Sequence, residues 1–112
     1  MTDRDLLELA AKALGIDHPG GEHCVNGPAL WDCKTLQWWK PLTDNGDALR
    51  LAVRLRMDVS FLDSLVEVCW FDEAESDNCS VEERINDAQG ECEATRRAIV
   101  RAAAEIGKTR SD

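Results

Sequence analysis

WWKPLTDNGDALRL, the stretch Trp38–Leu51, joins an aromatic pair, a turn and a helix start without interruption. A proline disfavours helical geometry in the residue before it, so Lys40 is extended, and the Asp-Asn-Gly sequence that follows supplies turn chemistry. Asp44 can accept backbone N–H groups as an N-cap, and Asp47 follows as a shorter version of the capping-box acid. The stretch therefore predicts a helix over 44–56, with both tryptophans folded back over it as core residues.

Apolar residues recur at helical spacing along this predicted helix. The expected buried stripe is Ala48, Leu49, Ala52 and Leu55, with Val53 as a further candidate, and Arg50, Arg54 and Arg56 face solvent. Asp44 and Asp47 resemble a carboxylate pair for acid–base chemistry, but helix capping explains both residues without further assumptions.

Working outward, the rest of the chain divides by breakers and periodicity. Thr2 can cap a first helix, and Gly15 stands where a C-terminal glycine belongs. Val59 to Phe71 alternates with period two, as in an antiparallel hairpin. The predicted elements are a helix over 1–14, a long irregular loop over 15–40 anchored by Trp31, the helix over 44–56, a hairpin over 58–71, an acidic connection over 72–87 with a possible third strand, and a helix over 88–107.

The last helix carries an apolar face and a charged face. We expect Cys92, Thr95, Ile99, Ala102, Ala103 and Ile106 to share the apolar face, with alanines that let the helix lie close to the sheet. Gly107 is expected to close this helix, and Arg97 and Arg101 to Glu105 to form a solvated, salt-bridged face.

A two-stranded hairpin is marginal alone, so its strands must pack against helices. A chain of 112 residues has the size of one domain with one core. The sequence therefore predicts an α+β fold: a small single layered domain in which three helices pack on a short antiparallel sheet of two to three strands.

Two segments carry a family resemblance. WWKPLTDNGDALRLAVRL, from Trp38 to Leu55, and ATRRAIVRAAAEIG, from Ala94 to Gly107, resemble the small bacteriophage and prophage proteins of the phage ABA sandwich domain family. Those proteins similarly carry a W-x-P-L-x-D-x-G-D-A-x-R-L run, then strands, then a terminal helix rich in arginine and alanine. The resemblance implies a phage origin and a layered α+β fold, and it implies no catalytic residues.

Charge is the global property with functional content. There are 22 acidic against 13 basic side chains, for a net charge of −9. Such a field repels DNA, RNA and anionic membranes and speeds encounter with a basic partner. The acidic residues that concentrate after the hairpin are the predicted partner-binding set: Asp72, Glu73, Glu75, Asp77, Glu82, Glu83, Asp87, Glu91 and Glu93.

Three functional interpretations follow. In the first, these carboxylates stand in for DNA phosphates, and the chain is a phage anti-defence protein of the anti-CRISPR kind that inhibits a basic, nucleic-acid-binding host complex. In the second, it is a homodimeric structural or regulatory protein of the phage whose hairpin edges or tryptophan faces pair, which an exposed Trp38, Trp39 or Trp70 favours. A solvated acidic surface kept for solubility alone is the simplest alternative to the first.

The third interpretation is a zinc-binding module. His18, His23, Cys24 and Cys33 are ligand types that zinc prefers, but the chain contains no Cys-x-x-Cys pair and His23 adjoins Cys24. Five cysteines leave one unpaired in any all-disulfide scheme, so reduced thiols are expected in a cytosolic protein. We expect no metal and no other cofactor.

Catalysis is not expected. The sequence holds no glycine-rich phosphate loop, no G-x-S-x-G elbow and no H-E-x-x-H pair. Cys24 beside His18 or His23 could supply a thiol nucleophile, but adjacent side chains seldom point at each other, and an orienting third group is missing. There is no apolar run long enough to span a bilayer, and the charged start Thr2–Asp5 is unlike a signal peptide, so the cytoplasm of the host cell is the expected location.

Overall fold

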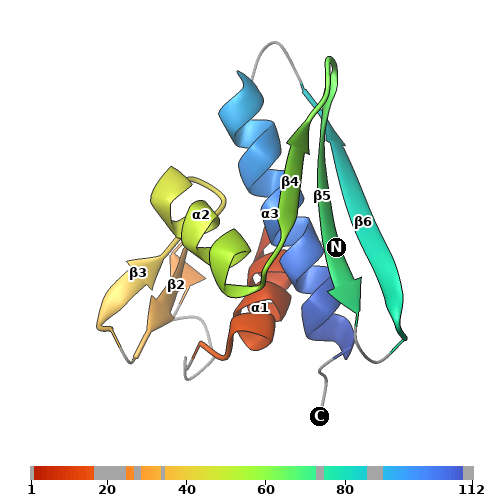
Figure 1. Ribbon diagram of the computed structural model, residues 1–112. Helices are drawn as coiled ribbons and strands as arrows, with labels where there is room; N and C mark the ends of the chain where they lie inside the picture. Colours follow the sequence, from red (N-terminus) through yellow and green to blue (C-terminus); the bar gives the residue numbers. More distant parts are fainter. Residues whose placement is uncertain are drawn as a thin grey trace.

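The computed structural model describes residues 2–16, 25–26, 29–33, 35–72, 75–85 and 90–109. In chain order the elements are α1 (Asp3–Leu14), β1 (Val25–Asn26), β2 (Ala29–Asp32), β3 (Gln37–Trp39), α2 (Asn45–Arg54), β4 (Asp58–Phe61), β5 (Leu65–Asp72), β6 (Asp77–Arg84) and α3 (Gly90–Thr109). The strands form two antiparallel sheets, in the orders β1-β2-β3 and β4-β5-β6 (Figure 1). The predicted α+β class, with three helices and a short antiparallel sheet, is confirmed.

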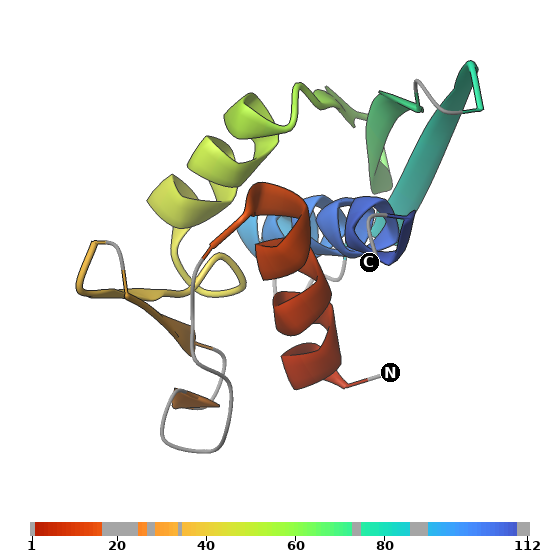
Figure 2. The same cartoon turned by 90° about the horizontal axis from the view of Figure 1, so that it is seen from below.

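Helix α3 lies at the centre of the molecule. In Figure 2 the β4-β5-β6 sheet and α2 lie on one side of α3, and α1 lies on the other. Val66, Val68 and Trp70 of β5 are buried on the side of the sheet that α3 covers. One core cluster therefore joins this sheet, β2, β3 and all three helices.

Helix α1 begins and ends where the sequence predicted. The Thr2 hydroxyl accepts the Asp5 N–H at 3.2 Å, and the Asp5 carboxylate accepts the Thr2 N–H at 3.0 Å, which completes a capping box. Hydrogen bonds that the Asp5 carboxylate accepts, first from the Thr2 N–H and then from the Thr2 hydroxyl, lower the pKa of Asp5. At the other end Gly15 adopts a φ of 76°, in the left-handed region that glycine tolerates best.

The start of α2 confirms one predicted cap and corrects the other. Asp44 is the N-cap and accepts the Asp47 N–H at 2.8 Å. Asp47 does not close a capping box, because the Asp44 N–H already donates to the Lys40 carbonyl. The Asp47 carboxylate instead accepts the Lys40 N–H at 3.0 Å and pairs with Arg50 at 2.7 Å. Both acids therefore hold the turn before the helix.

The predicted apolar stripe of α2 is partly wrong, because it included two exposed residues and omitted a buried one. Leu49 and Val53 are 63% and 61% exposed, whereas Leu51 is fully buried. The buried face is formed by Ala48, Leu51 and Ala52, which belong to the same core cluster as Trp39 and lie on a helix that α3 contacts. Helix α2 therefore has a buried apolar face and, on another side, an exposed apolar face that carries Leu49 and Val53.

The strands after α2 match the prediction closely. The expected hairpin over 58–71 is β4 and β5, and the possible third strand is β6, paired with β5 from Leu65↔Arg84 to Asp72↔Asp77. β4 pairs with β5 alone among the described strands, so one of its edges is free.

The predicted irregular loop over 15–40 is wrong where it is described between residues 25 and 39. That region contains β1, β2 and β3, with Leu30 opposite Trp39 and Trp31 opposite Trp38. The expectation that both tryptophans fold over α2 holds for Trp39, which is buried. Trp38 is 39% exposed and contacts Trp31 edge-on, with ring centroids 5.4 Å apart, because adjacent residues of a strand point to opposite faces.

Gly107 does not close α3, which continues to Thr109. It lies where α3 crosses α1: a Cβ there would lie 2.8 Å from the Leu9 carbonyl carbon and closer still to its oxygen. The alanines of α3 thus serve the close contact with α1 as well as the sheet. The expected salt-bridged face of α3 is present, with partners on other elements for both arginines: Arg97 binds Asp3 from α1 and Arg101 binds Glu83 from β6 at 2.6 Å, while Glu105 binds Lys108.

Candidate functional site

The predicted acidic set separates into groups that lie at different places. Asp72 and Asp77 are directly opposite each other at the end of the β5–β6 hairpin, and Glu75 lies in the turn between them. Glu91 and Glu93 belong to the first turn of α3, near the opposite end of β6 (Figure 1). Glu73 and Asp87 lie outside the described residues. The carboxylates predicted between Asp72 and Glu93 therefore do not all lie on one face of the molecule.

Two of these acids are engaged by arginines. Glu83 accepts Arg101, which also donates to the Glu82 carbonyl at 2.9 Å, and Glu93 accepts Arg96 at 3.1 Å. Arg96 further donates to the Leu42 carbonyl at 2.8 Å and to the Asn45 side chain at 2.6 Å. Arg96 thus joins α3 to the turn before α2 and to the start of α2. Glu83 and Glu93 serve the fold.

Glu82 belongs to a different surface, the outer face of the β4-β5-β6 sheet, which faces away from α3. Register places Ser60, Glu67 and Glu82 in one row across the three strands, and Asp58, Cys69 and Ser80 in the next. Glu67 and Glu82 are directly opposite each other, an arrangement of like charges that destabilises a sheet. We call Asp58, Glu67 and Glu82 the acidic sheet face.

Sequence reasoning missed Asp58 and Glu67 because they precede the acidic segment. The signal was present: Glu67 alternates with the buried residues of β5 and must therefore point outward. Placing it opposite Glu82 requires the strand register, which the sequence did not supply.

Cys69 reports the electrostatics of this face. Its pKa is raised first by burial of the thiol and then by the negative charge of Glu67, which also accepts a hydrogen bond from the thiol, and by Asp58. Both effects oppose formation of a thiolate. After burial, the charges of Glu67 and Asp58 therefore add to the rise in the pKa of Cys69.

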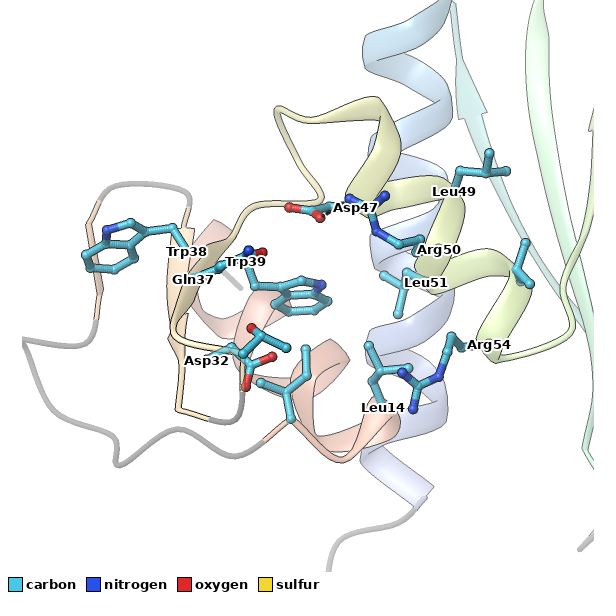
Figure 3. A pocket seen from close by; sticks show the side chains of 13 residues that line it. Leu14, Asp32, Gln37, Trp38, Trp39, Asp47, Leu49, Arg50, Leu51 and Arg54 are labelled. Atoms are coloured by element: carbon cyan, nitrogen blue, oxygen red, sulfur yellow. Dashed lines mark hydrogen bonds and ion pairs between the residues drawn. The ribbon is translucent and has the colours of Figure 1, made fainter.

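A second candidate surface surrounds the exposed apolar side of α2. Leu49 and Val53 are one helical turn apart and line a cavity of about 410 Å³ between α2 and the β2–β3 hairpin. Figure 3 shows the Trp39 indole within this cavity, while Trp38 points away from it. Asp32, Arg50 and Arg54 supply polar groups to the wall. The cavity is mainly apolar with a few charged groups, as ligand pockets commonly are.

Leu49 also lines a groove of about 430 Å³ on the other side of α2. Val59 and Phe61 of β4 form one wall, Ala48 and Leu49 form the other, and Cys92 and Ile99 of α3 contribute to the floor. Cys92, predicted on the apolar face of the last helix, is exposed because it faces this open groove. Phe61 is 66% exposed there.

A third hollow, between α1, β6 and α3, is lined by Arg97, Arg101 and Lys108. Each of these cations has a carboxylate within salt-bridge distance: Asp3, Glu83 and Glu105 respectively. This compensation argues against an anion site in that hollow.

The proposed zinc ligands His18, His23 and Cys24 lie outside the described residues, and Cys33 is exposed. Within the described part of the chain, no three His, Cys, Asp or Glu side chains are grouped to hold a metal ion. Cys69, Cys79 and Cys92 are free thiols. Burial, followed by the charges of Asp72 and Asp77, raises the pKa of Cys79.

Comparison of the chain with models of known protein families, with curated proteins and with solved structures finds no match. In the residues that the structure describes, no helix combines the length and apolarity needed to cross a membrane.

Proposed function

We propose that this chain is a small acidic accessory protein that works by binding a basic protein through the acidic sheet face. The observation that carries the proposal is the direct opposition of Glu67 and Glu82 on the side of the sheet away from α3. Paired like charges cost stability, so their presence is better explained by attraction to a basic partner than by folding. The net charge of −9 would speed encounter with such a partner.

The resemblance to phage proteins supports a phage or prophage origin, and this origin suggests the kind of partner. A host complex that binds nucleic acid has a basic groove, and carboxylates on a sheet can occupy it in place of phosphates. The chain would then act as an anti-defence inhibitor of the anti-CRISPR kind. The proposal needs no catalytic residue and no cofactor.

The test is capture of host proteins by the tagged chain, with a charge-reversed variant of the face. Asp58→Lys, Glu67→Lys and Glu82→Lys together should abolish capture of a basic protein. The control reverses Asp3, Glu8 and Glu105, exposed or half-buried acids on α1 and α3, with the same change in net charge. Duplex DNA should release the captured protein, because the DNA and this chain compete for the same basic groove of that protein. Equal capture by both variants, or capture that duplex DNA does not reduce, would overturn the proposal that these carboxylates occupy a nucleic-acid-binding groove.

A second candidate, a homodimeric interaction protein, is favoured by the exposed Leu49, Val53 and Trp38. Exposed apolar side chains that adjoin a cavity commonly mark a protein interface. Light scattering over a concentration series tests it. A dimer that Leu49→Asp dissociates supports this candidate, and a monomer at every concentration excludes it.

A further inference from the structure

The free edge of β4 has backbone groups available for an additional strand. The Leu62 N–H donates to the Leu65 carbonyl at 2.9 Å, and the same register pairs Ser60 with Glu67 and Asp58 with Cys69. Since antiparallel strands bond at alternate residues, Asp58 and Ser60 use their backbone groups on β5. The N–H and C=O groups of Val59 and Phe61 therefore point away from β5, toward the free edge of β4.

The side chains of the same two residues lie on the inner side of the sheet. Val59 is opposite Val68 and Phe61 is opposite Val66, and both partners are fully buried against the helical layer. Phe61 nevertheless remains 66% exposed, because the groove between β4 and α2 is open. At about 430 Å³ this groove is within the size range of ligand pockets, about 300–1,000 Å³.

The two sides of an added strand would meet different chemistry. Inward side chains would lie against Val59, Phe61 and the α3 residue Ile99, which are apolar. Outward side chains would lie beside Asp58, within reach of Glu67 for a long side chain. An occupant that satisfies both sides alternates apolar with basic residues.

The geometry points to β4 as a docking edge for an extended segment of the partner, in which Lys or Arg alternates with apolar residues and which adds to the sheet as a fourth, antiparallel strand. Main-chain hydrogen bonds would give this contact affinity, and the groove and the acidic sheet face would give it specificity. The inference rests on the proposed function, since it describes how a basic partner engages the acidic sheet face.

Calorimetric titration of the full chain with the amide-capped peptide KVKVKVK tests the inference. In an antiparallel added strand the valine N–H groups face β4, since residues opposite Val59 and Phe61 share their inner face. N-methylation of the valines should therefore weaken binding by about tenfold or more, and N-methylation of the lysines should leave it nearly unchanged. KKKKVVV, which has the same composition without the alternation, should bind more weakly than KVKVKVK.

Two phenylalanines provide a matched pair in the protein. Phe61→Ala should weaken peptide binding by about tenfold, because Phe61 would lose its buried contact in the complex. Phe71→Ala should change it less than about twofold, since Phe71, 57% exposed on the outer side of β5, lies away from the β4 edge. Thermal unfolding of both variants should match the parent, which separates a binding effect from a folding effect.

Some outcomes separate this inference from the proposed function. Equal binding of both N-methylated peptides, lost with Glu67→Lys, would overturn strand addition and leave the acidic sheet face as the binding surface. Absence of binding by any of the peptides would also overturn strand addition, while the capture experiment decides on the proposed function independently.

Discussion

The α1–α3 contact and the acidic sheet face lie on opposite sides of the molecule and are built in opposite ways. The first brings two backbones together through Gly107 and a set of alanines that are almost completely buried. The second places Glu67 directly opposite Glu82, where a neutral or oppositely charged pair would be more stable. The difference indicates that the helix pair supplies stability and that the sheet face is free to carry charge for another purpose.

The largest expected effect is a loss of stability at the α1–α3 contact. Gly107→Ala should destabilise the protein by about 3 kcal/mol or more, since its Cβ would overlap the backbone carbonyl of Leu9, which cannot move as a flexible side chain does. Chemical denaturation measures the change. Gly46→Ala is the control, because its Cβ would approach only the side chains of Arg50 and Asp44. Similar midpoints for the two variants would refute this account of the crossing.

A smaller effect is expected where α3 holds the turn before α2. Arg96→Met should cost about 1.5–3 kcal/mol, because the Leu42 carbonyl and the Asn45 side chain lose a charged donor. Arg97→Met removes only a partly exposed pair with Asp3 and should cost less than about 1 kcal/mol. Urea unfolding of both variants compares them, and an equal cost would mean that Arg96 contributes no more than a surface ion pair.

On the acidic sheet face, a substitution should increase the stability of the protein. Glu82→Lys should stabilise the protein by about 0.2–1 kcal/mol, since it replaces a like-charge pair across β5 and β6 with an attractive one. Added salt should reduce the gain because it screens exposed charges. A loss of stability in thermal unfolding would contradict the assignment of Glu67 and Glu82 to one face.

The smallest effect concerns the reactivity of a thiol. Glu67→Gln should lower the pKa of Cys69, because the substitution removes a negative charge and leaves a weaker, neutral acceptor for the thiol. More thiolate is then present at a given pH, so alkylation of Cys69 at about pH 8, followed by peptide mass mapping, should become several-fold faster. An unchanged rate would show that burial alone controls this thiol.

Local chemistry made much of the fold predictable. The caps Thr2, Gly15 and Asp44 and the period-two pattern of β5 each act over a few residues, and each confirmed the predicted element. The β2–β3 hairpin was missed because its strands are short and its turn contains Leu36 at a φ of 57°, a conformation that sequence reasoning assigns to glycine or asparagine.

The candidate surface was less predictable than the fold. Asp58, Glu67 and Glu82 are separated in sequence, and only the register of three strands brings them onto one face. Clustering along the sequence instead indicated Glu83 and Glu93, whose charges arginines neutralise. Long-range pairing is a property that composition and local spacing do not encode.

Gly107, at the crossing of α1 and α3, also affects how α3 is rotated about its own axis. Successive residues of an α-helix are separated by about 100° of rotation, so a shift of α3 by one position would bring the side chain of Ile106 or Lys108 against the Leu9 carbonyl. The contact at Gly107 therefore favours the observed rotational setting of α3 against α1. That rotational setting determines which residues of α3 face the β4-β5-β6 sheet. The contact with α1 therefore also controls the helix surface against which this sheet packs.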